Sequence, residues 1–370
     1  MNLCVYLPVC AGCHFDQLPY DQQSDFKIKS LETSLATAGL THPKIQFLSC
    51  GENGLRHRFD FTIEADRMGL YGKDKTLQDI KSCLQISPEL QQAYTDFRKI
   101  QFPIRKGSVR LRIGPDGKTR GAWLDFANVD IKNLLDDGSC LQTLFDLGFY
   151  VEVGQKNKSV ALVNQKFKLV DPILRQWFKT ELKNYVSQKL SCYISSFTQP
   201  SWITAKAMVK VVFNWLSELE TSSTPLSICE FGAGIGQFTL PLLSSRAFVD
   251  VYEFDESATQ ALRFNAKAAD LDANLEVHVG DFQKKDVSLQ KRYDLAFVNP
   301  PRSGLKNFVH EIIRLKTKNC IYISCFPESL ITDLKALTEA GYKIQEMTLV
   351  DQFPQTKHFE TCVLLQRIDA

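Results

Sequence analysis

A cysteine at the end of a short apolar segment is the first residue whose position suggests chemistry. Residues 321–323 are apolar, as in a buried strand; Cys325 follows them, and Pro327 prevents the strand from continuing. In α/β proteins ligands bind at the carboxyl ends of strands, so a thiol there could act as a nucleophile. A free cysteine in an apolar run is also a common core residue, and this segment alone leaves both interpretations open.

Three cysteines near the amino terminus could hold a metal. Cys10 and Cys13 form a Cys-x-x-Cys pair, and Cys4 precedes them. Cys83, which follows the turn-like segment 72–75, is our candidate for a fourth ligand. Four thiolates suit either Zn²⁺ or an iron–sulfur cluster, and the spacing does not decide between them. The alternative is a set of ordinary buried cysteines.

A glycine-rich loop between a predicted strand and a predicted helix indicates a second site. Gly232, Gly234 and Gly236 alternate with other residues in this loop, and glycines let a backbone turn sharply and approach a ligand closely. Glu253 ends the next predicted strand, roughly 20 residues later, where a carboxylate suits a ribose diol. Asp281 follows a third predicted strand and is a second acid at a strand end.

A fourth predicted strand, 293–298, leads into Asn299-Pro-Pro-Arg302. Together with the glycine triplet and the acid before it, Glu230, this pattern resembles the class I S-adenosylmethionine methyltransferases more than the nicotinamide dehydrogenases. A dehydrogenase loop has one more residue before its third glycine and directs a helix amino terminus at a pyrophosphate. Asn-Pro-Pro is common in enzymes that methylate an amino nitrogen or an RNA base. We therefore predict an α/β fold with a Rossmann-like class I methyltransferase domain.

The elements that must position these residues divide into three predicted parts. Residues 1–90 form the cysteine-cluster region, 91–194 a small α+β central domain, and 195–370 the methyltransferase domain. The last boundary lies in a polar loop that precedes an amphipathic helix, 203–219. Within the first part, residues 19–39 have the apolar stripe and the end signals of one helix.

The central part reads as hairpins and helices with basic edges. Residues 108–126 have a strand–turn–strand pattern, 129–147 look helical, and 149–163 form a second hairpin. Asp171 and Pro172 together look like the start of a helix whose apolar stripe ends at Val186. The basic edges fit a wall that faces RNA, and a packing domain is nearly as good an interpretation.

Composition narrows the class of protein. The 370-residue chain is long enough for two or three domains, and its formal net charge of +2 gives no overall signal for binding a polyanion. The amino terminus lacks the pattern of a signal peptide, and no stretch reaches the roughly 18–20 apolar residues of a membrane helix. We expect a cytoplasmic monomer without membrane contact. Eleven cysteines in such a chain indicate reactive or metal-binding thiols rather than disulfides.

Three motifs, taken with the amino-terminal cysteines, closely resemble the RNA (uracil-5)-methyltransferase family, whose members act on tRNA and large-subunit rRNA. The motifs are Asn299-Pro-Pro-Arg-Ser-Gly304, Ser324-Cys-Phe-Pro327 and Phe353-Pro-Gln-Thr-Lys-His-Phe-Glu360. The chain begins almost at its first cluster cysteine, so we expect no room for the small RNA-binding β-barrel of some members. It looks most like the short rRNA-type branch, which makes rRNA the favoured RNA partner and tRNA the second.

The resemblance implies a mechanism. Uracil C5 is a poor nucleophile, and addition of a thiolate to C6 makes C5 enolate-like, so that it can attack a methyl group. By match to the family, Cys325 is this nucleophile, and Glu360 is the base that removes the C5 proton. Arg302 or the neighbouring backbone would steady charge on the ring. The target uridine must leave its stack to reach the site.

The resemblance also implies two cofactors, S-adenosylmethionine and a [4Fe–4S] cluster. The positions that match the family's S-adenosylmethionine ligands are Gln199, Gly232, Gln237, Glu253 and Asn299, with Asp281 as a weaker addition. Cys4, Cys10, Cys13 and Cys83 match the family's four cluster ligands, which favours iron–sulfur over zinc.

Four positions depart from the family pattern: Ser201, Phe326, Gly232 and Leu84, where Asn, Asn, an aromatic residue and Pro are usual. Phe326, beside the proposed nucleophile, bears most on substrate identity. Two other functions remain as alternatives: an RNA-binding protein whose methyltransferase fold is inactive, and an amino-methylating enzyme that uses Asn299-Pro-Pro-Arg302. Intact Cys325 and Glu360 argue against the first, and the second leaves Cys325 without a role.

Overall fold

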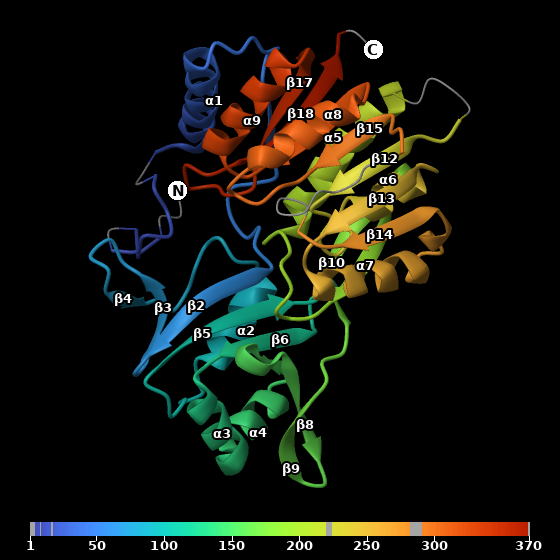
Figure 1. Cartoon of the computed structure of the whole chain (residues 1–370). Coiled ribbons are helices and arrows are strands. Elements are labelled where there is room, and N and C mark those ends of the chain that lie inside the picture. The colour runs from blue at the N-terminus through green and yellow to red at the C-terminus, as the bar shows by residue number, and fades with distance from the viewer. Residues whose placement is uncertain (1–3, 8, 16–17, 220–223, 282–290, 369–370) are drawn as a thin grey trace. The chain divides into compact units, whose positions relative to one another are not determined.

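The computed structural model describes residues 4–7, 9–15, 18–219, 224–281 and 291–368, and these form two compact units (Figure 1). Unit 1 comprises 1–18, 51–178 and 191–202, and unit 2 comprises 19–50, 179–190 and 203–370. The predicted division into 1–90, 91–194 and 195–370 follows the chain, whereas both units are discontinuous. Segment 19–50 belongs to unit 2 because its helix buries Leu31 and Leu35 in the core of that unit.

Unit 2 is built on an eight-stranded sheet. Its strands are β1 (Gln46–Ser49), β12 (Ser227–Phe231), β13 (Phe248–Glu253), β14 (Leu275–Val279), β15 (Leu295–Val298), β16 (Asn319–Ser324), β17 (Tyr342–Asp351) and β18 (Glu360–Arg367). The order is β1-β17-β18-β16-β15-β12-β13-β14, and only β18 runs antiparallel to its neighbours. All residues of β15 and β16 are buried, as is usual for central parallel strands covered on both faces. The predicted α/β domain and its strands at 249–253, 275–279 and 293–298 are confirmed.

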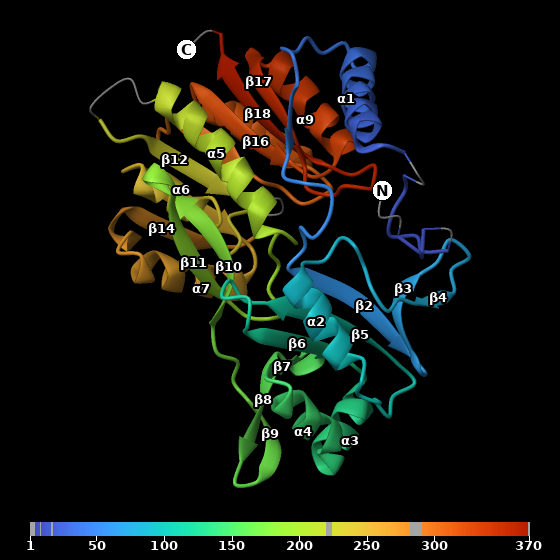
Figure 2. The same cartoon turned by 180° about the vertical axis from the view of Figure 1, so that it is seen from behind.

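Helices cover both faces of this sheet (Figures 1 and 2). They are α1 (Tyr20–Thr37), α5 (Trp202–Leu219), α6 (Thr239–Ser244), α7 (Glu256–Ala268), α8 (Val309–Leu315) and α9 (Pro327–Glu339). On one face, apolar residues of α1, α8 and α9 pack on β15 and β16; α5 is seen in front of the sheet from the other side (Figure 2). The predicted helices 19–39 and 203–219 are confirmed. Among the described residues, no helix is long and apolar enough to cross a membrane.

Unit 1 has a second eight-stranded sheet, in the order β4-β3-β2-β5-β6-β7-β8-β9. Its elements are β2 (Arg58–Glu64), β3 (Arg67–Tyr71), β4 (Leu77–Asp79), α2 (Pro88–Phe97), β5 (Lys106–Ile113), β6 (Arg120–Asp125), α3 (Asn128–Asp137), α4 (Ser139–Asp146), β7 (Phe149–Val153), β8 (Lys158–Val163) and β9 (Lys166–Val170). The predicted hairpins β5–β6 and β7–β8 are confirmed, and only the β6–β7 pair is parallel. Phe61, Tyr94 and Phe97 pack edge to face in the core between α2 and the sheet.

Two predicted elements of unit 1 differ in the structure. The helical stretch 129–147 is two helices, because Gly138 has φ of +73° and ends α3 in the left-handed conformation. The helix predicted from Asp171 to Val186 is wrong. Residues 175–192 form the strands β10 (Arg175–Leu182) and β11 (Val186–Cys192).

The apolar spacing of this segment suggested a helix, but only part of the stripe is buried. Trp177 and Phe178 are buried, whereas Ile173 and Val186 are more than half exposed. Asn184 and Tyr185 both have positive φ, which makes the turn between the two strands. β10 and β11 pair with each other, and this pairing overrides the weak helical pattern.

Candidate active site

The sheet of unit 2 brings Cys325 and Glu360 to the same end of two neighbouring strands. In the antiparallel β16–β18 pair Ser324 lies opposite Thr361, so the next residues, Cys325 and Glu360, face each other where the ladder ends. Cys325 is half-buried and Glu360 is 2% exposed. The proximity of a thiol and a carboxyl group is therefore a consequence of strand register.

Electrostatics connects this pair with the Asn-Pro-Pro-Arg segment. Burial raises the pKa of Glu360 to about 8, and the positive charge of Arg302 works against this rise. Burial and the neighbouring Glu360 raise the pKa of Cys325 to about 11, which Arg302 again opposes by charge and by a hydrogen bond. Three motifs separated in the sequence thus supply one thiol, one carboxyl group and one guanidinium that interact.

Hydrogen bonds hold the loops that carry these groups. Asp333 of α9 accepts a hydrogen bond from the Leu305 N–H at 2.7 Å and another from the Tyr322 hydroxyl at 2.5 Å, which joins the loop after Arg302 to β16. A Cβ at Gly304 would lie 2.7 Å from an Asp333 carboxylate oxygen, and the φ of Gly304 is +70°. Glycine is therefore required at this close approach.

The loop before Glu360 is fixed from α1. Lys27 Nζ lies 2.6 Å from Asp351 Oδ1 in an ion pair whose side chains are fully buried, and it also donates to the Phe353 carbonyl at 3.1 Å. Gln23 donates from its side chain to Gln355 Oε1 at 2.8 Å. The amino-terminal helix therefore anchors the segment that leads into the carboxyl group of the site.

The glycine loop lies at the end of β12, between the ends of β13 and β15, which is the switch point of the sheet. Gly232 has φ of +80°, and a Cβ there would lie 2.4 Å from the Asn299 carbonyl oxygen. The Asn299 N–H donates to the Phe231 carbonyl at 2.9 Å. The predicted ligands Gly232 and Asn299 are therefore adjacent. The same contact explains why this chain has glycine where the family pattern has an aromatic residue.

Glu253 braces the same loop. Its carboxylate accepts hydrogen bonds from the backbone N–H groups of Gly234 and Phe254, both at 2.8 Å, and of Asp255 at 3.0 Å. Burial raises its pKa, and these three donors oppose the rise. A carboxylate has about four lone-pair sites, so one remains for a ligand hydroxyl.

Two buried polar side chains at this loop fit the polar end of a ligand. Burial raises the pKa of Glu230 to about 8; neither of its carboxylate oxygens makes a well-formed hydrogen bond within the described residues, although the Thr239 hydroxyl offsets part of the burial effect. The side-chain nitrogen of Gln237 is buried and has no partner within the same described residues. Because buried polar groups are normally hydrogen-bonded, this donor and these acceptors suit the amino-acid end and ribose of S-adenosylmethionine. Glu230 was not among the ligands predicted from the sequence, and its place as the acid before the glycines was the available signal.

A sequence profile of the tRNA (uracil-5-)-methyltransferase family matches residues 160–368. The chain belongs to this family. It is an RNA uracil-C5 methyltransferase.

Two relatives and one solved structure are similar to this chain over nearly its whole length. An RNA methyltransferase of Bdellovibrio bacteriovorus, described as uncharacterized, is 40% identical over 98% of this chain and 95% of its own length. A protein of Marinomonas named a 23S rRNA (uracil(1939)-C(5))-methyltransferase is 26% identical over 98% of this chain and 80% of its own length. The Pyrococcus abyssi tRNA (uracil-54, C5)-methyltransferase, solved with S-adenosyl-L-homocysteine, has the same fold, with a TM-score of 0.72 at 23% identity over 97% of this chain and 86% of that one.

Gln199 and Asp281, two further ligands predicted from the sequence, belong to unit 1 and unit 2 respectively. Gln199 is buried in unit 1, in the loop between β11 and α5. Arg58 and Arg110 each donate to a carbonyl of this loop, those of Thr198 and Ser195, at 2.6 Å. Asp281 is the last residue before a stretch outside the described residues. The roles of Gln199 and Asp281 stay predictions.

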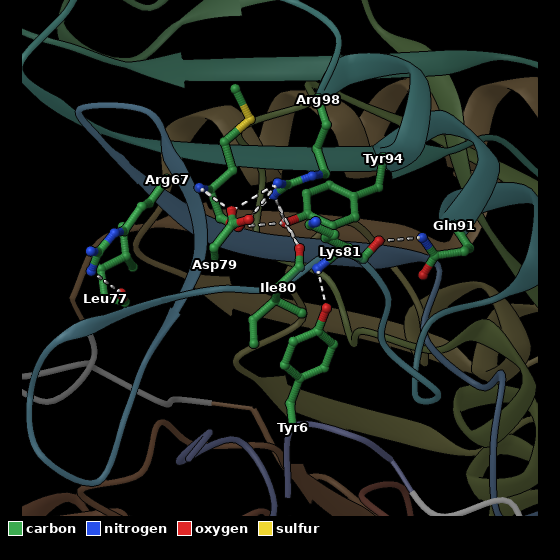
Figure 3. Close-up of polar contacts among 10 residues, drawn as sticks. Tyr6, Arg67, Leu77, Asp79, Ile80, Lys81, Gln91, Tyr94 and Arg98 are labelled. Atoms are coloured by element: carbon green, nitrogen blue, oxygen red, sulfur yellow. Dashed lines mark hydrogen bonds and ion pairs between the residues drawn. The ribbon is translucent and has the colours of Figure 1, made fainter.

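The amino-terminal cysteines of the methyltransferase lie against the β3–β4 hairpin of unit 1. Cys10 forms a bridge with Gly72, and the Lys81 N–H donates to the Tyr6 hydroxyl at 3.0 Å (Figure 3). The Cys83 N–H donates to the side chain of Gln91 at 3.0 Å. These contacts bring the segment of Cys4, Cys10 and Cys13 to the segment that carries Cys83.

A polar network fixes the strand that leads to Cys83 (Figure 3). Arg98 makes a two-pronged ion pair with Asp79 at 2.8 and 2.9 Å, and it also donates to the Ile80 carbonyl at 3.2 Å. The Tyr94 hydroxyl donates to the same carbonyl at 2.6 Å. Tyr94 of α2 and Arg98 at the end of this helix therefore fix the segment between β4 and Cys83.

The four thiols interact electrostatically. Burial raises the pKa of Cys13 to about 12, with further rises from Cys83, Cys10 and Cys4, while the Arg56 charge lowers it. Within the described residues, no three of these sulfurs all lie within 4.8 Å of one another. Four such thiols suit a zinc ion or an iron–sulfur cluster.

Proposed function

We propose that this methyltransferase acts on a uridine of rRNA through a covalent adduct between Cys325 and uracil C6, with Glu360 as the base. The observation that carries the mechanism is the meeting of Cys325, Glu360 and Arg302 at the end of the β16–β18 ladder. An inactive fold or an amino-methylating enzyme would give these groups no task.

The first step is attack by sulfur. The Cys325 thiol gives up its proton to solvent, and its sulfur bonds to C6; the electrons of the C5=C6 bond move toward C5 and O4. Because the thiol pKa is about 11 in the free chain, few molecules hold a thiolate at neutral pH. Arg302 favours the thiolate by its charge, and the same charge would stabilise the enolate that forms on the ring.

The second step transfers the methyl group, and the third frees the RNA. S-adenosylmethionine, when bound, would supply the methyl group of its sulfonium to the enolate-like C5, and S-adenosylhomocysteine would leave with the electrons of the S–CH₃ bond. Glu360 then takes the proton from C5. The electrons of the C5–H bond restore the C5=C6 bond, and the C6–S bond breaks, returning a thiolate to Cys325. The product is 5-methyluridine.

The methyl donor would be held at the switch point of the sheet. Glu253 would accept from the ribose, Gly232 and Asn299 would form the floor, and Gln237 would donate from its buried amide. Gln199 is the proposed fifth ligand. Support for this assignment comes from the buried, unpartnered polar atoms of Glu230 and Gln237 among the described residues.

We further propose that Cys4, Cys10, Cys13 and Cys83 hold a [4Fe–4S] cluster. The mutual electrostatic interaction of the four thiols supports a shared centre, and their match to the family's ligand positions favours iron–sulfur. Bound there, the cluster would cross-link the amino-terminal segment to the segment after β4 by four metal–thiolate bonds.

A covalent trap tests the mechanism. RNA with 5-fluorouridine at the target should accept the Cys325 sulfur and the methyl group, but fluorine cannot leave C5 as a cation, so the adduct should persist. We expect a methylated protein–RNA band that survives denaturation, and none from the Cys325→Ala variant. An adduct that forms equally in that variant would refute the mechanism.

Mapping 5-methyluridine tests the choice of RNA. The rRNA preference rests on the Asn299-Pro-Pro-Arg302 pattern of the rRNA-type branch and on the name of the Marinomonas relative. In cells that lack the gene for this chain, we expect one 5-methyluridine to disappear from 23S rRNA while those of tRNA stay. The opposite result would assign the chain to tRNA.

A further inference from the structure

The buried carboxyl group of Glu360 is held by an amide whose orientation is itself fixed. The side-chain nitrogen of Gln352 donates to Glu360 Oε1 at 2.9 Å, and Thr204 Oγ1 donates to Gln352 Oε1 at 2.8 Å. Gln352 and Thr204 are fully buried, Glu360 is 2% exposed, and all three belong to unit 2. Because these side chains exclude water, their hydrogen bonds restrict rotation strongly.

The hydrogen bonds run in one direction, from Thr204 through Gln352 to Glu360. A glutamine amide has a donor end and an acceptor end of nearly the same size. The Thr204 hydroxyl occupies the acceptor end, so the NH₂ end faces the carboxylate. A reversed amide would set its oxygen against the negative Glu360 oxygen, which is repulsive. The ionised carboxylate of Glu360 only accepts hydrogen bonds and so selects this orientation of Gln352, and the Thr204 hydroxyl supports it by donating to the other end of the amide.

The backbone of Gln352 is fixed as well. It directly follows β17, and its N–H donates to the Val350 carbonyl at 2.9 Å. The preceding residue, Asp351, forms the buried ion pair with Lys27. Both the backbone and the side chain of Gln352 are thus set independently of any substrate.

We propose that Gln352 is a positioning residue for the proton transfer, and that Thr204 fixes its amide for this role. This proposal rests on the proposed function, in which Glu360 is the base. With Oε1 engaged by Gln352, Oε2 is the oxygen that takes the C5 proton. The electrons of the C5–H bond then form the C5=C6 bond, and the C6–S bond breaks to return the thiolate.

The prediction concerns the last step alone. Gln352 does not approach the thiol in this scheme, so its loss should slow elimination and leave adduct formation intact. A purely structural role would instead lower adduct formation, elimination and S-adenosylmethionine binding together. The two roles therefore differ in which step changes.

The test is rapid-quench kinetics with unmodified target RNA and methyl-labelled S-adenosylmethionine, counting label in the covalent adduct and in free RNA. Variants are Gln352→Met and Thr204→Val, which keep volume and remove the hydrogen bonds, with Thr204→Ser as the conservative replacement. Glu360→Gln gives the reference for blocked elimination. Gln366→Met is the matched control. Gln366 lies on β18, as Glu360 does, and within the described residues its side chain is hydrogen-bonded only to the side chain of Gln345.

We expect Gln352→Met to slow product release by about ten- to a hundredfold, the range for one hydrogen bond to a charged group, with adduct accumulating as in Glu360→Gln. The acid limb of the release rate should move to higher pH. Thr204→Val should slow product release and move its acid limb to higher pH, each by less than Gln352→Met does. Thr204→Ser and Gln366→Met should resemble the wild type.

Three results would overturn the proposal. If Glu360→Gln traps adduct but Gln352→Met and Thr204→Val release product at the wild-type rate, the positioning role is wrong and the mechanism stands. If Gln352→Met slows adduct formation as much as release, its role is structural. If neither the wild type nor Glu360→Gln forms an adduct, the proposed function itself fails and this inference falls with it.

Discussion

The catalytic end of unit 2 and the cysteine cluster of unit 1 both gather residues that are far apart in the sequence, but by different means. Cys325 and Glu360 are neighbours because two strands pair in a fixed register. Cys10 and Cys83 are brought together by one isolated β-bridge, between Cys10 and Gly72, and by single hydrogen bonds such as that from the Cys83 N–H to Gln91. A ladder of backbone hydrogen bonds sets positions more firmly than isolated loop contacts.

The difference teaches how each site depends on its ligand. The catalytic pair is positioned before any substrate binds, and its partners are buried side chains such as Gln352. Burial raises the pKa of Cys13 and of Cys83, and thiols must lose their protons to bind a metal. Metal–thiolate bonds would therefore contribute much of what holds the cluster region together, whereas the catalytic end is held by protein contacts alone.

The largest effect should come from Cys325. Replacement by alanine removes the nucleophile, so we expect methyl transfer to fall on the order of 10⁴-fold or more, measured as kcat with saturating RNA. S-adenosylmethionine binding by calorimetry should not change. Cys320→Ala, on the same strand but buried in the core, should keep activity. Turnover retained in Cys325→Ala would mean that the thiol at the ladder's end is not the nucleophile.

Cys83→Ser should abolish the cluster and affect methyl transfer less. We expect anaerobically purified protein to contain about four irons per chain and to be brown, and the variant to lose both. Cys140→Ala is the control, because Cys140 is a core cysteine whose thiol donates to the Gln101 carbonyl. A colourless wild-type protein loaded with zinc would contradict the iron–sulfur assignment.

Lys27→Met tests whether protein contacts hold the catalytic end. It leaves Asp351 charged and buried, so the free energy of unfolding of unit 2 should fall by about 3–5 kcal/mol, measured by urea titration. Adding Asp351→Asn should recover part of the loss. Lys29→Met, on the exposed side of α1, should change little. Equal stability of the two lysine variants would show that the buried pair does not anchor the loop.

The smallest expected effect is a shift in pH dependence. The base must be ionised to accept a proton, so the rate of elimination from the adduct should rise with pH up to about 8, the pKa of Glu360. Arg302→Gln removes a charge that lowers this pKa, and the rising limb should therefore move to higher pH by up to about one unit. Arg314→Gln, in an exposed ion pair with Glu311, is the control. If Arg302→Gln leaves the rising part of the pH profile unchanged, the charge of Arg302 does not influence the pKa of Glu360.

Much of unit 2 was predictable because its signals are local. The strand before Cys325, the glycine loop and the strand that ends at Glu253 are each specified by short runs of apolar residues and by glycines. The candidate catalytic and ligand residues were predicted from short motifs with characteristic residue types and spacings. In unit 1 the segment 171–186 had spacing that fits a helix, and only pairing of β10 with β11 showed it to be a hairpin.

The sequence by itself determined the family, the α/β class of the methyltransferase domain and the identity of Cys325 and Glu360 as candidates, because these depend on residue types and on periods of a few residues. The tertiary structure decided which distant side chains meet: Arg302 with Cys325, Gln352 with Glu360, and Lys27 with Asp351. It also showed that segment 19–50 belongs to unit 2. Such pairings depend on strand register and on burial in a common core, and no local pattern along the chain encodes either.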